Sequence, residues 1–563
     1  MSEKDLQKEI LDLKAQLKKF QKNNLGLVFE EKPEDVVTQC QENIPILKEV
    51  LSRRIATKNN LNNLLIEGDN YHALSVLNYT HKKTIDLIYI DPPYNTGASD
   101  WKYNNDYVDK EDTYRHSKWL SLMRHRLNLA RDLLKDEGFL ICAIDHNELF
   151  TVGVLLDKIL GEENRIGIIT VVHKPEGRNQ EKFFGTSNEF MLVYAKNIRS
   201  AKFNKVVLDS ELQDRFDEED ENGKYRLKNF IRLTDGKYSL RESKPHFFYP
   251  VYVSKDLNNF SITKKTNYEK VFPITEKGVE RTWKTTKNTL EKLAKNGDIV
   301  AKRETNGIVL YEKLREDQVI KTHWMKKEYH AYHFGTKILE SILGTKKFDF
   351  PKSLHLIFDI LKLTTKKDAV ILDFFAGSGT TGHAVLALNN EDNGARKFIL
   401  CTNNENNIAE DVTYERVKRV INGYKDLTTG VKIAGLGGNL TYYKTDLVNI
   451  GRLHKVPDEA KIRVTYQVGE MIAVREDTLS EVEKNDWWQI FEGDGRATAV
   501  YFKEDKTKLG ELIVKLEKKN IPVALYIFSW GKNEYKGEYS SEKIRVEDIP
   551  EPILEVYKEI NRP

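Results

Sequence analysis

A carboxylate, two prolines and a tyrosine follow an apolar run in residues 85–97, which read IDLIYIDPPYNTG. The Asp91 carboxylate can accept a hydrogen bond, and a backbone carbonyl such as that of Pro92 can accept a second, because proline fixes φ. Two preorganised acceptors can hold the hydrogens of an exocyclic nucleobase amine while its nitrogen attacks a methyl group. The ring of Tyr94 offers a stacking face worth about 1–3 kcal/mol. Taken alone, the same residues also fit an ordinary strand end.

A glycine-rich stretch, DFFAGSGTTG at residues 373–382, lies between an expected strand and an expected helix. Its spacing satisfies the pattern GxGxxG, and glycine lets a ligand lie against bare backbone. Glu405 follows the next expected strand, where a carboxylate can accept both hydroxyls of a ribose. These features favour a cofactor that contains a nucleoside over a tight turn without a ligand.

The cofactor can be NAD or S-adenosylmethionine, since both contain an adenosine ribose. S-adenosylmethionine has no phosphate and needs a cation for its amino-acid carboxylate. Lys352, in the stretch FDFPKS, is a candidate for that cation, and the plainer alternative is a solvated lysine. The GxGxxG pattern alone leaves both cofactors open.

Apolar strands alternate with helices on both sides of a long central region. The helix KWLSLMRHRLNLARDLLKDEG ends at Gly138, a typical C-cap residue. Strands are expected at NNLLIEG, KTIDLIYI, FLICAID, IGIITVVH, EFMLVYAK, KDAVILDFF and RKFILCTN. This alternation predicts an α/β fold with a doubly wound, mostly parallel sheet covered by helices on both faces.

Five segments are expected along the chain. Residues 1–22 have apolar residues at alternating spacings of four and three, which predicts an amphipathic helix. The expected segments are an N-terminal helical segment 1–55, the first part of the sheet domain 56–199, an inserted α+β domain 200–335, the second part of the sheet domain 336–431, and a small C-terminal α/β module 432–563.

Bulk composition excludes several classes of protein. The net charge is only +3, so a polyanion must be met by a local patch. No apolar run is long enough to span a bilayer, and MSEKDLQKEI lacks the apolar centre of a secretory signal. The three cysteines, Cys40, Cys142 and Cys401, lie far apart, which predicts a reducing cytoplasm and no metal site.

The two chemical motifs together resemble those of the amino-group DNA methyltransferases. The DPPY motif precedes the glycine loop, which is the circularly permuted order of the β-type enzymes. The extended forms DPPYNTG and DFFAGSGTTGHAV, with FDFPKS between them, are similar to the adenine-N6 Mod subunits of type III restriction–modification systems. The resemblance covers roughly residues 60–430. It implies a Rossmann-like methyltransferase fold in which the insert is the target-recognition domain.

The resemblance also implies roles for individual residues. The motif that would grip and stack a flipped adenine comprises Asp91, Pro92, Pro93 and Tyr94. The residues expected to surround S-adenosylmethionine are Asp69, Lys352, Asp373, Phe375, Gly377, Gly379, Thr380 and Glu405. Residues 277–330 contain 13 Lys or Arg against 8 Asp or Glu. This excess fits tracking of DNA phosphates, and the candidates for DNA contact are Arg281, Trp283, Lys284 and Trp324.

The expected activity is site-specific methylation of adenine N6 in double-stranded DNA by S-adenosylmethionine, without a covalent enzyme–DNA intermediate. Cytosine-N4 DNA or RNA remain alternative substrates, although loops of this class that act on cytosine more often begin with serine. A DNA-reading scaffold for a partner nuclease and an NAD enzyme are further alternatives. The resemblance implies a homodimer and a helicase–nuclease (Res) partner in a bacterial or archaeal cytoplasm, with no membrane association. The chain has no Walker A motif of its own.

Overall fold

The computed structural model describes residues 30–57, 61–177, 182–206, 216–315, 320–531 and 535–561, except the side chains of residues 99 and 100. The chain divides into two compact units, the larger formed by residues 1–204 and 322–563 and the smaller by residues 205–321. The amphipathic helix expected at residues 1–22 lies outside the described residues. Throughout the described ranges, the structure contains no helix of the length and apolarity that crossing a bilayer requires.

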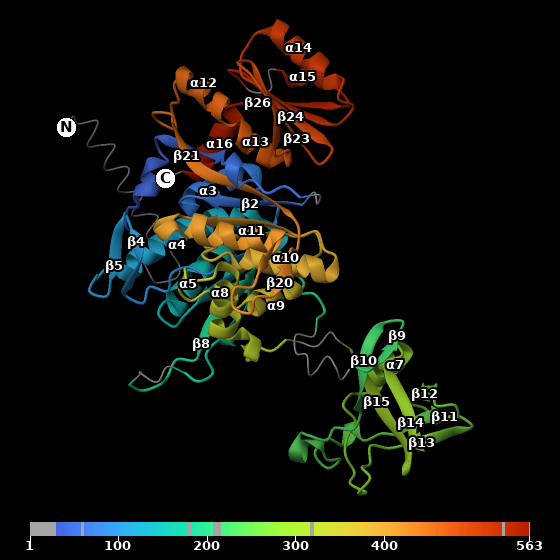
Figure 1. Ribbon diagram of the computed structural model, residues 1–563. Coiled ribbons are helices and arrows are strands. Elements are labelled where there is room, and N and C mark those ends of the chain that lie inside the picture. Colours follow the sequence, from blue (N-terminus) through green and yellow to red (C-terminus); the bar gives the residue numbers. More distant parts are fainter. Residues whose placement is uncertain are drawn as a thin grey trace, which may run out of the picture. The chain divides into compact units, whose positions relative to one another are not determined.

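The larger unit is built on one long sheet with the strand order β1-β21-β2-β18-β17-β3-β6-β8-β7-β16. Figure 1 labels β21, β2 and β8 among these strands. These strands are β1 (Asn43–Glu49), β2 (Asn62–Glu67), β3 (Ile85–Ile90), β6 (Leu134–Ile144), β7 (Arg165–Val172), β8 (Asn188–Ala195), β16 (His323–Trp324), β17 (Val370–Asp373), β18 (Lys397–Thr402) and β21 (Asn439–Asn449).

Five neighbouring strands at the centre of this sheet, β2, β18, β17, β3 and β6, run parallel. β17 pairs directly with β3, with Leu372 opposite Ile88. All five strands therefore end at the same edge of the sheet, and the loops that follow them gather there. This confirms the expected mostly parallel α/β sheet, in which the chain visits β3 long before β17.

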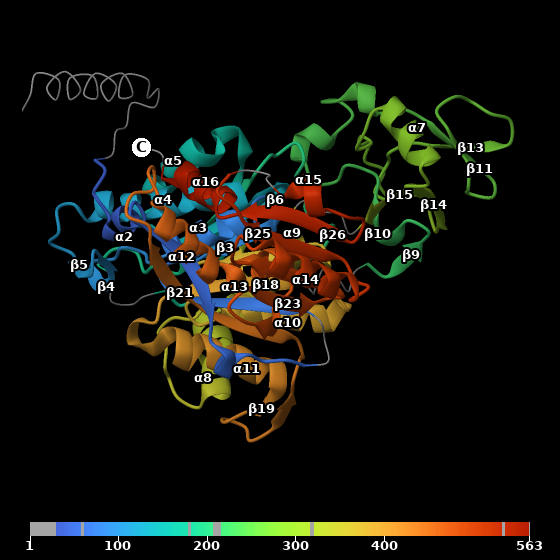
Figure 2. The same cartoon turned by 90° about the horizontal axis from the view of Figure 1, so that it is seen from above.

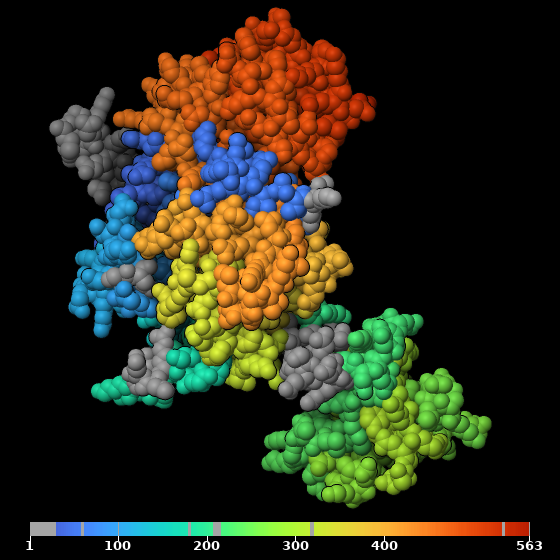
Figure 3. All heavy atoms as spheres, viewed as in Figure 1, coloured from blue at the N-terminus to red at the C-terminus, as the bar shows by residue number. Residues whose placement is uncertain are grey.

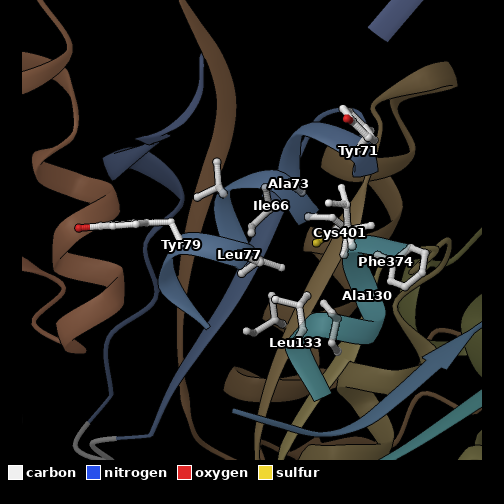
Figure 4. Packing of buried hydrophobic residues seen from close by; sticks show 14 of the residues in the cluster. Ile66, Tyr71, Ala73, Leu77, Tyr79, Ala130, Leu133, Phe374 and Cys401 are labelled. Atoms are coloured by element: carbon white, nitrogen blue, oxygen red, sulfur yellow. The ribbon is translucent and has the colours of Figure 1, made fainter. Parts of the chain in front are cut away.

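Helices cover both faces of the sheet (Figure 2). One layer contains α3 (Asn70–Thr80), α4 (Arg115–Leu133) and α5 (Leu149–Leu160), and the other contains α8 (Lys337–Leu343), α10 (Thr380–Asp392) and α11 (Glu415–Asn422), while α9 (Leu354–Thr364) packs on α10. Every residue of α3 from Tyr71 to Thr80 is buried. Figure 4 shows α3 packed against Ala130 and Leu133 of α4 and Cys401 of β18. A helix that is buried all round needs a cover on its outer side as well.

That cover comes from the C-terminal part of the chain, whose helices α13 and α16 pack on α3. Figure 3 shows the orange and red residues of this part lying directly against the blue N-terminal residues of the larger unit. The elements of this part are α12 (Asp458–Gln467), α13 (Gly469–Glu476), β22 (Ser480–Lys484), β23 (Trp488–Gly493), β24 (Arg496–Tyr501), α14 (Lys506–Glu517), β25 (Val523–Phe528), α15 (Lys536–Tyr539), β26 (Ile544–Ile549) and α16 (Glu551–Ile560), and β22 to β26 form a second sheet.

Two strands of the long sheet lie where the sequence predicts other structures. Residues 43–49, within the expected helical segment 1–55, form β1, because Pro45 disfavours a helix and Ile44, Ile46 and Leu47 are fully buried. Residues 439–449, within the expected C-terminal module, form β21, which joins β1 to β2. A local pattern of apolar residues identifies a strand but does not tell which sheet it joins.

The smaller unit contains two antiparallel sheets, β14-β15-β10-β9 and β12-β11-β13. Its elements are β9 (Glu218–Asp220), β10 (Gly223–Asn229), β11 (Val251–Ser254), β12 (Phe260–Ser261), β13 (Tyr268–Val271), α7 (Lys287–Lys295), β14 (Ile299–Glu304) and β15 (Gly307–Arg315). In the larger unit, the two residues that flank the smaller unit in sequence make backbone hydrogen bonds within the larger unit itself. The Asn204 N–H donates to the Leu363 carbonyl at 2.8 Å, and the Thr170 N–H donates to the Thr322 carbonyl at 2.8 Å.

The larger unit also contains several short elements. They are α2 (Asp35–Gln39), the 3-10 helices η1 (Leu51–Arg53), η2 (Glu162–Asn164), η5 (Lys327–Tyr329) and η7 (Glu405–Asn407), the π-helices η6 (Tyr332–Thr336) and η8 (Ile408–Tyr414), the hairpin β4 (Ala98–Tyr103) and β5 (Asp106–Asp109), and the hairpin β19 (Gly423–Lys425) and β20 (Lys432–Ala434).

Replacement of Tyr557 tests whether the C-terminal helix α16 stabilises the sheet domain. Tyr557 is fully buried, and its hydroxyl donates to the Pro45 carbonyl at 2.6 Å. We expect Tyr557→Ala to lower the stability of the larger unit by about 3–5 kcal/mol through the cavity it leaves, and Tyr557→Phe by about 1 kcal/mol. Scanning calorimetry measures both changes. Val514→Ala, at a residue of α14 that is 53% exposed, is the control. An unchanged transition in Tyr557→Ala would contradict this packing role.

Candidate active site

The candidate residues lie in the loops that follow the parallel strands. Asp69 follows β2, and Glu405 follows β18. Residues 91–94 follow β3, and residues 374–379 follow β17. We call residues 91–97 the aspartate loop and residues 373–382 the glycine loop. Because β3 and β17 are paired neighbours, these two loops emerge side by side at one edge of the sheet.

The aspartate loop is held in place by buried polar contacts. The Trp119 Nε1–H donates to the Pro93 carbonyl at 2.7 Å. Asn95 is fully buried with a positive φ of 55°, accepts from the Trp101 Nε1–H at 3.2 Å and donates to the buried carboxylate of Glu148. Among the described residues no group donates to the Pro92 carbonyl, so its acceptor capacity is unused within the protein.

Four side chains meet at the start of this loop. The Lys352 ammonium lies 3.3 Å from the Asp91 carboxylate and 2.5 Å from the Glu189 carboxylate, and it also donates to the Tyr94 hydroxyl. The Tyr94 hydroxyl in turn donates to Glu189 at 2.9 Å. Glu189 is the second residue of β8, and nothing in the local sequence NEFMLVYAK distinguishes it from an ordinary strand start.

Burial and mutual charge shift these groups in opposite directions. Burial raises the pKa of the Asp91 carboxyl, and the Lys352 ammonium opposes this shift while the Glu189 carboxylate adds to it. Burial also acts to raise the pKa of Glu189, but the Lys352 ammonium and the His173 ring outweigh it and hold that pKa below its usual value. Burial acts to lower the pKa of Lys352, but the two carboxylates raise it, so the ammonium stays charged.

The glycine loop presents bare backbone at two positive-φ positions. Gly377 has a φ of 47°, and a Cβ there would lie 3.1 Å from the Phe348 ring. Gly379 has a φ of 74°, and a Cβ there would lie 3.1 Å from the methyl carbon of Thr413. Side chains at these positions would strain the backbone and fill the space beside it. The two glycines therefore let the backbone of this loop pass close to Phe348 and Thr413 and leave it bare of side chains.

Asp373 fastens the start of the glycine loop. Its carboxylate accepts from the Phe375 N–H at 3.0 Å and from the Thr381 hydroxyl at 2.6 Å. Burial raises the pKa of Asp373 to about 7, against the effect of these two donors. Phe375 is half-buried and packs against the apolar core. Both residues thus contact the loop and the core in this structure.

A buried arginine, whose role the sequence analysis did not predict, donates hydrogen bonds to the same loop. Arg416 of α11 is fully buried and donates through Nη1 to the Ser378 hydroxyl at 3.1 Å and to the Thr380 hydroxyl at 2.8 Å. Burial lowers the pKa of its guanidinium to about 9. The Thr380 hydroxyl is therefore engaged from below by Arg416. In the sequence, Arg416 is one basic residue in an amphipathic helix, so no local signal marks it.

The two carboxylates expected near the adenosine have protein partners. Asp69 caps α3 by accepting from the Tyr71 N–H at 2.7 Å, and it lies 3.0 Å from the Arg126 guanidinium. Glu405 lies 2.7 Å from the Lys102 ammonium, and the Tyr107 hydroxyl donates to it at 3.0 Å. Lys102 lies in β4 and Tyr107 in β5, so this hairpin contacts the loop that follows β18.

Lys352 lies beside the aspartate loop, where its ammonium donates to Glu189 and Tyr94 and lies 3.3 Å from the Asp91 carboxylate. An ammonium between two carboxylates is not a free cation for the carboxylate of a cofactor. The expectation that Lys352 binds the methionine carboxylate rested on its place near β17 in sequence. The structure gives it close partners from the loop after β3 and from β8.

The two tryptophans proposed as DNA contacts are corrected by the structure. Trp283 is 1% exposed in the core of the smaller unit, and its Nε1–H donates to the Tyr249 carbonyl at 2.8 Å. Trp324 is 5% exposed, belongs to β16 of the larger unit and stacks on Tyr329. Large aromatic rings gain most by burial, so their presence in a basic segment does not indicate a surface role.

The two cations proposed as DNA contacts are half-buried and have protein partners. The Arg281 guanidinium donates to the Ser239 hydroxyl. The Lys284 ammonium lies 3.1 Å from the Glu312 carboxylate. Both side chains therefore contribute to the smaller unit itself.

The edge as a whole fits a cofactor that contains a nucleoside. Bare glycine backbone follows β17, and carboxylates at the ends of β2 and β18 lie in the loops on the same edge. Residues 61–177, 182–206, 216–315 and the other described ranges contain no group of three or more His, Cys, Asp or Glu side chains that could hold a metal ion.

A β-carbon in the glycine loop tests the cradle. We expect Gly379→Ala to weaken the binding of S-adenosylmethionine at least about tenfold, because a non-glycine residue at this positive φ costs roughly 1–2 kcal/mol and its Cβ crowds Thr413. Titration calorimetry measures the affinity. Gly510→Ala, at a helical glycine with no atom within 4 Å of its Cβ, is the matched control. Equal affinities in the two variants would contradict a cofactor role for this loop.

Comparison with known proteins identifies the family. Residues 85–413, more than half of the chain, match the model of the DNA methylase family. The chain is 34% identical over 377 residues to the type II methyltransferase M.KpnI of Klebsiella pneumoniae, covering 64% of this chain and 88% of that protein.

Two type III restriction-modification Mod subunits are also similar. The EcoPI Mod subunit of Escherichia phage P1 is 32% identical over 381 residues, covering 62% of this chain and 58% of that protein. The StyLTI Mod subunit of Salmonella typhimurium is 32% identical over 405 residues, covering 67% of this chain and 58% of that protein. The chain thus spans somewhat more than half the length of these Mod subunits. The resemblance seen in the two sequence motifs is confirmed, and the chain belongs to the DNA methylase family.

Proposed function

We propose that this protein transfers a methyl group from S-adenosylmethionine to the exocyclic N6 amine of an adenine in double-stranded DNA. The observation that carries the proposal is the pairing of β3 with β17, which puts the Asp91 loop beside the glycine loop. One loop offers acceptors for an amine, and the other offers glycine backbone without side chains. S-adenosylmethionine supplies a methyl group on a positively charged sulfur.

The residues of the aspartate loop would prepare the amine for attack. The Asp91 carboxylate accepts one amine hydrogen, and the Pro92 carbonyl, to which no described residue donates, accepts the other. Both acceptors are fixed before the base arrives, because Trp119 and Asn95 hold the loop. Fixed acceptors stabilise the positive charge that develops on nitrogen without reorganising during the reaction.

Tyr94 would receive the base after it leaves the duplex. Extrusion of a base costs a few kcal/mol, and stacking on an aromatic ring returns about 1–3 kcal/mol. The Tyr94 hydroxyl contacts both Lys352 and Glu189, so the ring is held in one orientation. A ring held in this way loses little side-chain entropy when the base stacks on it.

Adenine is the proposed base because an aspartate leads the motif, as it does in the adenine-N6 enzymes that the sequence resembles. Cytosine N4 is the second candidate, since its amine needs the same two acceptors.

We further propose that residues 205–321 recognise the DNA sequence. The stretch 277–330, which overlaps this unit, has 13 Lys or Arg against 8 Asp or Glu. Exposed cations there would contact phosphates.

Replacement of Asp91 tests the chemistry. We expect Asp91→Ala to lower kcat for methyl transfer to duplex DNA by about 100-fold or more, because a preorganised acceptor is lost at the reacting nitrogen. Binding of S-adenosylmethionine should change little. Nucleoside digestion followed by mass spectrometry identifies the methylated base. Asp136→Ala, at an exposed aspartate of β6, is the control. Near-wild-type turnover in Asp91→Ala would refute the mechanism, and N4-methylcytosine as the product would select the second candidate.

The relatives named as Mod subunits of type III systems support a proposal about assembly. We propose that the protein forms a homodimer and that it pairs with a helicase–nuclease (Res) subunit. The 65.4 kDa chain should then give a particle of about twice that mass at micromolar concentration in mass photometry or light scattering. A particle of single-chain mass would contradict the dimer. Co-purification with a helicase–nuclease encoded beside it would test the second partner.

A further inference from the structure

We propose that Glu189 is a positioning residue that takes Lys352 as its ion-pair partner and thereby leaves the Asp91 carboxylate free to accept a proton from the amine. The inference rests on the proposed methyl transfer and adds the fate of the proton. Glu189 and Lys352 both lie outside the DPPY motif, so the motif alone does not indicate that they pair.

The distances favour Glu189 as the principal partner of Lys352. The ammonium lies 2.5 Å from Glu189 and 3.3 Å from Asp91. The Glu189 carboxylate also accepts from the Tyr94 hydroxyl at 2.9 Å, so two donors converge on it. Ion pairs with close, buried hydrogen bonds are the stronger ones. Both donors reach the same oxygen of Glu189, Oε2, whereas the ammonium approaches Asp91 only at Oδ1 and at the longer distance.

The exposures of the three side chains follow the same order. The Glu189 side chain is 5% exposed, that of Lys352 is 12% exposed, and that of Asp91 is 26% exposed. Glu189 and Lys352 thus form the inner pair, and Asp91 faces outward. Asp91 is therefore both the more exposed carboxylate and the one that lies farther from the Lys352 ammonium.

The charges of this cluster do not cancel. Asp91, Glu189 and Lys352 together carry one net negative charge, which belongs to Asp91 once Lys352 is assigned to Glu189, and the His173 ring acts on the same side as Lys352 by lowering the pKa of Glu189. Other titratable groups that face the cluster are Tyr89, Tyr94, His173, Cys142 and Asp373. Burial raises the pKa values of both tyrosines far above neutrality and that of the Cys142 thiol as well, so these three stay uncharged. Asp373 lies at the end of the neighbouring strand and makes its hydrogen bonds within the glycine loop.

Methylation of an amine requires a proton acceptor. The nitrogen lone pair forms the new N–C bond, and the C–S bond of the sulfonium donor breaks with its electron pair left on sulfur. The nitrogen now carries the positive charge, and it becomes neutral when an N–H bond breaks and the proton passes to a carboxylate oxygen of Asp91. Atoms and charge balance without a further reactant.

The opposite pKa directions support this division of roles. The pKa of Asp91 is raised and that of Glu189 is lowered, so a proton that reaches the cluster goes to Asp91. Two carboxylates whose surroundings separate their pKa values commonly serve as a proton acceptor and a permanent anion. A plainer reading is that Glu189 only anchors the Tyr94 ring.

Three variants separate these readings. In Glu189→Gln, Lys352 loses its partner and turns to Asp91, so we expect kcat to fall roughly 10- to 100-fold and the acid limb of the kcat–pH profile to move to lower pH. In Lys352→Met, two carboxylates face each other without a cation, so the acid limb should move to higher pH. In the double variant Glu189→Gln/Lys352→Met, both members of the ion pair are removed and Asp91 keeps its negative charge. We therefore expect kcat to return to within about tenfold of the wild type.

The double variant decides between the two readings. Loss of an anchor for Tyr94 would make the double variant at least as slow as Glu189→Gln, and that result would overturn the proposal. Unchanged acid limbs in both single variants would overturn it as well. Tyr94→Phe serves as the reference for loss of the hydroxyl contacts alone, since it leaves all three charges in place. If Lys352→Met fails to fold, the profile of Glu189→Gln against that of Tyr94→Phe still gives the answer, because only the former should shift.

Titration of S-adenosylmethionine and of duplex DNA against each variant shows whether binding is preserved. Failure of the underlying function would look different from failure of this inference. A wild-type protein that yields no methylated DNA refutes methyl transfer, whereas an active wild type with the wrong variant pattern refutes only the role of Glu189.

Discussion

Parallel hydrogen bonding between neighbouring strands is the constraint on which the candidate site depends. The pairing of β17 with β3 fixes where both strands end, so residues nearly three hundred positions apart lie in adjacent loops. β2 and β18 continue the same arrangement and add the Asp69 and Glu405 loops to that edge. No contact between the loops themselves has to create this proximity, because the backbone ladder of the sheet already imposes it. The side chains of the loops are therefore free to serve chemistry.

The two central loops achieve rigidity by different means. The aspartate loop has stiff residues and is held from outside by Trp119 and Glu148. The glycine loop has the most permissive residues, and its shape comes from groups beneath it, chiefly Asp373 and Arg416. This difference suits the partners proposed for them. A base needs fixed acceptors, while a cofactor needs close approach to backbone, which only glycine allows.

Local patterns in the sequence predict much of this arrangement. Apolar runs predict the strands, the GxGxxG spacing predicts the cradle, and DPPY predicts the acceptor loop, because each feature is written in consecutive residues. Glu189 and Arg416 could not be predicted, since their importance comes from neighbours on other strands and helices. Trp283 shows the reverse error, in which a residue type typical of DNA contact fills a core. The membership of β1 and β21 in the long sheet likewise depends on pairing across the whole chain.

The way in which the smaller unit is attached has an evolutionary consequence. The chain leaves the larger unit after Asn204 and returns at Thr322, and both points are tied by backbone hydrogen bonds to elements of the larger unit. Backbone bonds do not depend on side-chain identity. A recombination event that exchanged everything between these two points would leave the long sheet, its loops and its C-terminal cover unaltered. A different smaller unit could thus replace the present one while the larger unit keeps its sequence and fold.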